Sequence, residues 1–174
     1  MSRQQRSVAG IATQRIVSTL FVVAVIFNYP WELAQALLFT GSDDFRSIWW
    51  HCFVASLGDG VLVLLVFASG WLAWRRQNWF VRPGAWGYVL MLVSGLTIAI
   101  VVEWISVHVL QRWTYLPAMP RVPVLDIGIV PIVQMLVLPP LIFRIVAASA
   151  SRARRVGNTA LPHTMVRGLD LPEE

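Results

Sequence analysis

Four carboxylic acids interrupt the apolar stretches of this 174-residue chain, one in each stretch: Glu32, Asp59, Glu103 and Asp126. A charge in hydrocarbon is costly, so acidic side chains at such positions mark functional sites. One protonated and one ionised carboxyl in the same cavity could divide the donor and acceptor roles of acid–base catalysis. They could equally relay protons in a transporter. We take Glu32, Glu103 and Asp59 as the candidate catalytic residues.

Other polar and aromatic side chains accompany these acids. Asn28, Glu32 and Gln35 are spaced four and three residues apart, which places them on one face of a helix. Trp31 and Trp104 each adjoin an acid, and we expect them to form the walls of a buried site. The candidate ligand-binding residues are Asn28, Trp31, Gln35, Trp104, Gln134, Trp113 and Tyr115.

A metal site is a weaker hypothesis. His51 and His108 fall near the outer ends of the second and third apolar stretches, where they could form a rim with Asp126 or bind a metal. Carboxylate oxygens would favour magnesium or manganese, and histidines would permit zinc or iron. Helical metal motifs such as His-Glu-x-x-His are missing from the sequence. The cofactor is therefore unknown: the sequence requires none and leaves a divalent metal open.

The elements that position these residues are predicted by composition. Hydrophobic residues make up 57% of the chain and charged residues 13%, which indicates a membrane protein. Four apolar stretches, at about 16–40, 49–73, 86–110 and 124–148, are long enough to cross a hydrocarbon core of roughly 30 Å. We expect an all-α integral membrane four-helix bundle with antiparallel neighbours. Residues 1–15 would then form a cytoplasmic N-terminal segment and 149–174 a mobile cytoplasmic tail around the 16–148 membrane domain.

The distribution of basic residues predicts the orientation. All fourteen are arginines, and eleven of them fall on the side of the predicted bundle that carries both termini. This bias predicts that both termini lie on the cytoplasmic side. The membrane expected for this chain is the bacterial inner (plasma) membrane. All four acids then lie in the outward half of the bilayer. The net charge of +5 indicates topology and contact with anionic lipid headgroups, and we do not expect nucleic-acid binding.

Several short motifs carry a family resemblance. They are Trp31-Glu32-x-x-Gln35, His51-Cys52, Gly58-Asp59, Glu103-Trp104 and Pro131-x-x-Gln134. Together they resemble an uncharacterised family of small bacterial four-helix integral membrane proteins, over about residues 16–145. The resemblance implies a recurring set of positions and no particular activity. A looser architectural similarity to EXPERA (sterol-isomerase-like) domains, which bind apolar ring systems in the membrane, implies a lipid-phase ligand.

Three functional hypotheses follow. The leading one is an inner-membrane protein whose outward-facing carboxylate and tryptophan cavity binds a lipid-like or isoprenoid-like ligand, with acid–base chemistry on it. The second is a proton-coupled or divalent-cation transporter, for which four helices would need a homo-oligomer. The third is a non-catalytic membrane subunit that docks a partner. The partners expected from the sequence are membrane lipids and a lipid-like small molecule.

Overall fold

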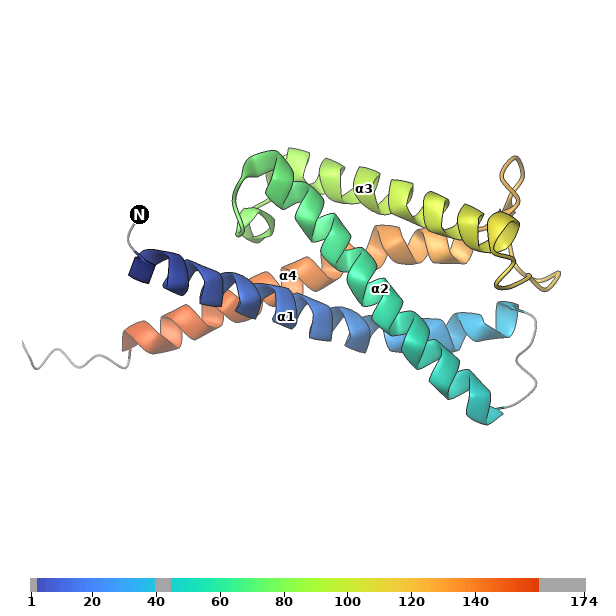
Figure 1. Cartoon of the computed structure of the whole chain (residues 1–174), viewed down its shortest axis with the longest axis horizontal. Coiled ribbons are helices and arrows are strands. Elements are labelled where there is room, and N and C mark those ends of the chain that lie inside the picture. The colour runs from blue at the N-terminus through green and yellow to red at the C-terminus, as the bar shows by residue number, and fades with distance from the viewer. Residues whose placement is uncertain (1–2, 40–44, 160–174) are drawn as a thin grey trace, which may run out of the picture.

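Four long helices form most of the protein in the computed structural model, which describes residues 3–39 and 45–159 and the side chains of 13–39 and 47–151. They are α1 (Arg3–Gln35), α2 (Phe45–Trp74), α3 (Gly84–Trp104) and α4 (Ile129–Thr159) (Figure 1). With the short helical turns that follow α1 and α3, they provide four stretches long and apolar enough to cross a membrane: Thr13–Leu38, Ser47–Trp74, Gly84–Val109 and Ile129–Ser151. The prediction of an all-α protein with four helices long and apolar enough to span a membrane is therefore confirmed.

The helices pack in a ring in which α1 contacts α2 and α4, and α3 contacts the same two helices. The chain reverses direction between successive helices, so α1 begins and α4 ends at the same end of the bundle (Figure 1). We call this the terminal end. The opposite end, where α1 ends and α4 begins, is the distal end.

The apolar core includes Ile127 at the distal end, but much of it lies in the half of the bundle nearer the terminal end. Leu20 on α1, Val63 on α2 and Phe143 on α4 are completely buried there. The α3–α4 contact is especially close at Gly95, where a Cβ atom would lie 2.5 Å from the backbone oxygen of Met135. Any larger residue at this position would force the two helices apart.

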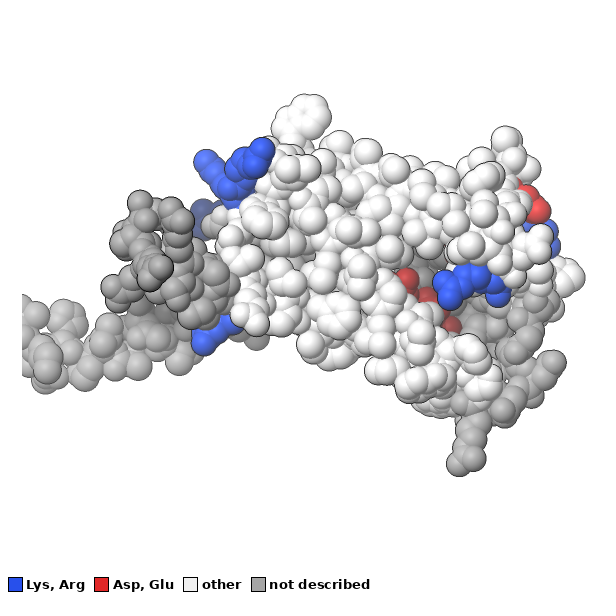
Figure 2. All heavy atoms as spheres, viewed as in Figure 1, with Lys and Arg blue, Asp and Glu red and all other residues white. Residues whose placement is uncertain are grey.

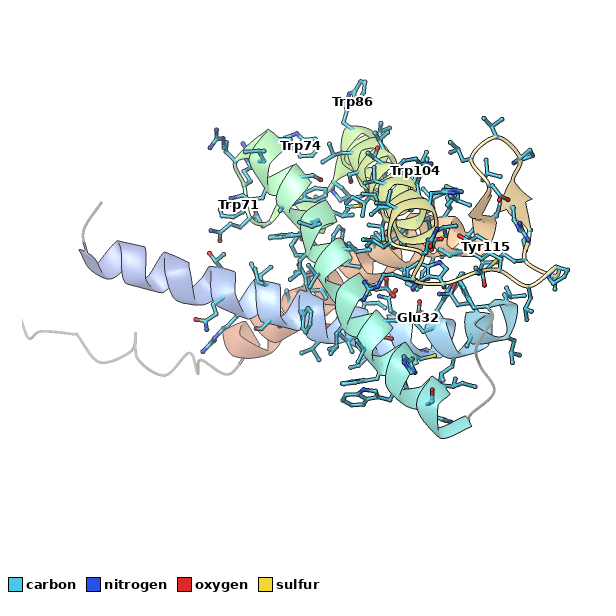
Figure 3. The ribbon with its side chains drawn as sticks, turned by 45° about the vertical axis from the view of Figure 1, so that its right-hand side comes forward. Glu32, Trp71, Trp74, Trp86, Trp104 and Tyr115 are labelled. Carbon is cyan, nitrogen blue, oxygen red and sulfur yellow. The ribbon has the colours of Figure 1, made fainter. Side chains whose placement is uncertain are left out.

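Tryptophans gather at the terminal end, and one of them enters the core. Trp71, Trp74 and Trp86 lie at this end, far from Glu32 (Figure 3). Trp79, in the short helix η2 (Trp79–Val81), is buried instead, and its Nε1 donates a 3.1 Å hydrogen bond to the carbonyl of Phe67.

At the distal end the structure differs from the sequence prediction. The fourth helix begins at Ile129 rather than 124, because the preceding residues form a small antiparallel hairpin of β1 (Arg121–Val122) and β2 (Ile127–Gly128). Asp126 lies in the turn of this hairpin with a φ of 49°. Residues 124–128 are mostly apolar and adjoin α4, so the sequence pattern extended the helix to residue 124. Their backbone groups instead form strand and turn hydrogen bonds, such as that from Asp126 N–H to the Val122 carbonyl.

The other helix ends also differ from the expected boundaries. α1 begins at Arg3, so most of the expected 1–15 segment belongs to this helix. α4 continues through Pro139 and Pro140 to Thr159, beyond the expected boundary at 148. The remainder of the expected tail, 160–174, lies outside the described residues. α3 ends in one π-helical turn, η3 (Ile105–Val109), directly after Glu103 and Trp104.

Candidate functional site

The side-chain amide of Gln134 is the centre of a buried polar cluster between three helices. Its Nε2 lies 2.8 Å from Asn28 Oδ1, 3.0 Å from Glu32 Oε1 and 2.9 Å from Asp59 Oδ2. Gln134 comes from α4, Asn28 and Glu32 from α1, and Asp59 from α2. The structure thus brings together four of the residues that the sequence singled out.

A backbone carbonyl fixes the orientation of both amides. Asn28 Nδ2 donates a 2.8 Å hydrogen bond to the carbonyl of Ala24. Since the Ala24 carbonyl can only accept, the NH₂ group of Asn28 faces Ala24 and its oxygen faces Gln134. Gln134 must therefore donate to this oxygen from its own NH₂ group. This nitrogen has two hydrogens for three acceptors. Two of the three acceptors, Asn28, Glu32 and Asp59, must therefore share one hydrogen.

Their common neighbour, Gln134 Nε2, makes Glu32 and Asp59 a close carboxyl pair. Their two oxygens on Gln134 lie within about 6 Å of each other, the range over which like charges interact strongly. The carboxyl groups are also within hydrogen-bonding reach of one another. Gln35 Nε2 donates a further 2.6 Å hydrogen bond to Glu32 Oε1. The one ion pair among the described side chains joins Arg121 to Asp126. No described cation therefore neutralises Glu32 or Asp59.

Glu103 lies beside the pair on α3 and is 5% exposed. It accepts a hydrogen bond from the hydroxyl of Tyr115, which in turn accepts one of 2.9 Å from the backbone N–H of Gly128. The Trp113 indole lies near the same carboxyl but outside hydrogen-bonding geometry. Glu103 also interacts electrostatically with both Glu32 and Asp59, so the three acids form one charged neighbourhood.

Tyr115 is held over this neighbourhood by the connection between α3 and α4. Leu116 N–H donates a 2.9 Å hydrogen bond to the carbonyl of Leu38, and Phe39 forms a β-bridge with Tyr115. Burial, and then the hydrogen bond to Glu103, raise the pKa of Tyr115, so its hydroxyl remains a donor. Tyr115 and Glu32 lie in the same distal half of the molecule (Figure 3).

The cluster is open to the surface near the distal end. Acidic atoms are visible in a hollow of the surface there, and a basic side chain lies at its rim (Figure 2). A separate apolar hollow of about 620 Å³ lies between α1 and α2 and is lined by Val25, Ile26, Tyr29, Trp49, Trp50 and Phe53. None of the four described acidic residues lines that second hollow, so the chemistry belongs to the cluster around Gln134.

Two tryptophans expected as walls of the site differ in placement. Trp31 is partly buried against the core. Trp104 is 44% exposed, and its ring contacts that of His108 at a centroid distance of 5.7 Å. The prediction of Trp104 as a wall is not supported by this placement, because adjacent positions on a helix point about 100° apart and Glu103 takes the inward direction.

The predicted rim residues are dispersed. His51 bonds within its own helix, with Nδ1 2.7 Å from the carbonyl of Ser47, and His108 Nε2 lies 3.0 Å from the carbonyl of Leu125. The Asp126 side chain is 62% exposed and pairs with Arg121 at 3.2 Å, apart from the cluster around Gln134. Within residues 13–39 and 47–151, no three His, Cys, Asp or Glu side chains are arranged to hold a metal ion.

No protein-family model, curated protein or solved structure matches this chain. The candidate site therefore rests on its own geometry. Two of its contributors were absent from the sequence prediction: the carbonyl of Ala24 and the N–H of Gly128. Both act through the backbone. The one sequence signal for Gly128 is its small size, since a Cβ there would lie 3.1 Å from the Tyr115 ring.

Proposed function

We propose that this chain is a multi-pass protein of the bacterial inner membrane whose distal end faces outward. In this proposal the cluster around Gln134 binds a lipid-like or isoprenoid-like molecule and exchanges protons with it. The four apolar helices and the excess of arginine near the terminal end support the membrane placement. The hollow at the distal end supports entry of the ligand from that side.

The observation that carries the proposal is that Glu32 Oε1 and Asp59 Oδ2 lie 3.0 Å and 2.9 Å from the same nitrogen, Gln134 Nε2. Two ionised carboxylates at this separation repel each other, and one proton held between them removes that repulsion. Such a pair contains one proton donor and one proton acceptor. The protonated member can give its proton to a polar group of the ligand, and the ionised member can take one.

Glu103 has a different environment and a different role. The neutral hydroxyl of Tyr115 donates to its carboxylate, which stabilises the ionised form through a charge-assisted hydrogen bond. We assign Glu103 to accepting a proton from the ligand or to orienting its polar group. Its negative charge also favours retention of the proton on the Glu32–Asp59 pair.

The packing beneath the cluster favours binding over transport. Directly toward the terminal end, the bundle interior is filled by apolar side chains such as Leu20, Val63 and Phe143, which are completely buried. A transported ion would need polar groups or water along its route. A ligand that enters and leaves at the distal end or from the bilayer needs no such route.

The test is to identify what the protein carries from its membrane. Wild type, Glu32→Gln, Asp59→Asn and the control Asp126→Asn are purified in lipid nanodiscs, and their organic extracts are compared by mass spectrometry. We expect one lipid-soluble species enriched with wild type and the control. Its occupancy should fall about tenfold in the other two, as expected for loss of one hydrogen bond to a charged group. Identical extracts from all four proteins would contradict the proposal.

A further inference from the structure

The connection between α2 and α3, residues 75–83, carries three exposed arginines: Arg75, Arg76 and Arg82. Basic side chains gather at this terminal end of the molecule (Figure 2). The acidic residues whose side chains are described all belong elsewhere, either to the cluster around Gln134 and Glu103 or to the distal hairpin. The connection therefore presents three positive charges on a surface without a described acidic neighbour.

Two buried aromatic side chains fix this connection to the bundle. Trp79 is 6% exposed and Phe80 4%, and their rings contact that of Phe143 on α4 at centroid distances of 5.8 Å and 5.6 Å. The Trp79 ring also lies directly on α2, where a Cβ atom at Gly70 would be 2.1 Å from it. The backbone that carries the three arginines is thus held in place against both α2 and α4.

Membrane topology alone does not require this anchoring. Arginines orient a membrane protein by their number on one side, and a freely moving loop would serve equally well. A connection that is already ordered loses less conformational freedom when a ligand binds to it. Guanidinium groups also match phosphate in geometry, because they donate two parallel hydrogen bonds to its oxygens. The anchored connection is therefore suited to holding a phosphate group.

Exposed tryptophans on both sides of the connection indicate its depth in the bilayer. Trp71 and Trp74 precede it on α2, Trp86 follows it on α3, and all three lie at the terminal end (Figure 3). Trp74 also stacks on the anchoring ring of Trp79 at a centroid distance of 5.5 Å. Since indole rings favour the boundary between hydrocarbon and headgroups, the neighbouring arginines would lie at the level of the lipid phosphates.

We propose that Arg75, Arg76 and Arg82 together form a binding site for the headgroup of an anionic phospholipid in the leaflet at the terminal end. This inference rests on the membrane placement in the proposed function and does not depend on the ligand of the distal cluster. A phosphodiester with a net negative charge complements the three guanidinium groups. A zwitterionic headgroup fits less well, because its own cation is repelled by them.

The experiment compares two phospholipids that differ only in their headgroups. Full-length protein in neutral detergent micelles is titrated with phosphatidylglycerol or with phosphatidylcholine of the same acyl chains, and Kd is measured by native mass spectrometry. We expect wild type to prefer phosphatidylglycerol by about tenfold, as for one charge-assisted hydrogen bond. Replacing all three arginines of the connection by glutamine should remove this preference.

A charge-matched control separates a site from a general attraction. The control replaces three other arginines on the side of the chain that carries both termini: Arg152→Gln, Arg154→Gln and Arg155→Gln. It lowers the net charge by the same amount and should keep the preference. Equal loss in the two triple variants would overturn the proposal, because it would show that net charge alone attracts the lipid.

Wild type provides a test that no folding defect can mimic. Added salt should weaken its preference for phosphatidylglycerol, since the arginines are exposed and screened. Equal affinity for the two lipids, or a preference that salt does not change, would overturn the proposal. If the preference fails while the membrane extracts still contain a species lost in Glu32→Gln, only the phospholipid site is wrong. If the preference holds and that species is missing, only the ligand proposed for the distal cluster is wrong.

Discussion

Gln134 Nε2 and Asn28 Oδ1 are joined by a 2.8 Å hydrogen bond between two buried side chains 106 positions apart. The bond connects the last helix to the first at the level of the acidic cluster. Because the carbonyl of Ala24 orients Asn28, and Asn28 orients Gln134, the donor that Glu32 and Asp59 share is fixed by the backbone of α1. The site is thus positioned by helix packing rather than by loops.

This relationship predicts energetic coupling between the two amides. Asn28→Leu and Gln134→Leu should each destabilise the protein, because each leaves a buried polar partner unsatisfied. The double variant should lose less than the sum of the two by about 1 kcal/mol, the usual net value of a hydrogen bond. Unfolding in mixed detergent–SDS micelles measures all four proteins. Strict additivity would show that the amides do not interact.

Substitution by alanine should destabilise the protein at one of two glycines on neighbouring helices and have little effect at the other. At Gly95 a Cβ atom would lie 2.5 Å from the Met135 backbone oxygen, so Gly95→Ala should cost about 1–3 kcal/mol by forcing α3 from α4. At Gly58 nothing lies within 4 Å, so Gly58→Ala should change the free energy of unfolding by less than about 1 kcal/mol. The same unfolding assay measures both. Equal effects would contradict the close α3–α4 packing.

The raised pKa of Tyr115 predicts a late ionisation. A group that binds its proton more tightly when folded contributes stability that is complete below its ordinary pKa of about 10 and is lost as the pH rises through the folded value. The ultraviolet titration of wild type minus that of Tyr115→Phe isolates this residue. We expect the midpoint of the difference curve above pH 10. A midpoint at or below that value would mean that the bond to Glu103 does not form.

Asp126 should contribute little, despite its position in an apolar run. Its ion pair with Arg121 is exposed on both sides, and such pairs contribute at most about 1 kcal/mol. Asp126→Asn should therefore unfold almost as wild type does, and raising the salt concentration should remove any difference. A loss of several kcal/mol would indicate a buried carboxylate, as the sequence suggested.

The periodicity of the sequence predicted which residues share a helix face. It did not predict the contacts made by the connections between helices. Asn28, Glu32 and Gln35 share a face because their spacing is helical, and hydropathy alone located the four spans. The hairpin at 121–128 was hidden because its second half, residues 124–128, is mostly apolar and adjoins α4 directly. The contact between Tyr115 and Glu103 depends on how the α3–α4 connection folds back onto Phe39, and no local pattern specifies that path.

The placement of Trp104 was also not predictable from the local sequence. Its neighbour Glu103 is acidic and buried, yet the indole faces outward and contacts His108. Adjacency along the sequence says little about adjacency in a helix bundle, because successive side chains point in different directions.

The most direct test of the central claim is infrared spectroscopy of the protein in hydrated bilayers, in the C=O stretching region of protonated carboxylic acids. Wild type is compared at neutral pH with Glu32→Gln, Asp59→Asn and the control Asp126→Asn. If Glu32 and Asp59 hold one proton between them, wild type and the control show the same protonated-carboxyl band, and each of the other two substitutions shifts or abolishes it. No such band in wild type, or a band unchanged by both substitutions, would contradict the shared-proton pair.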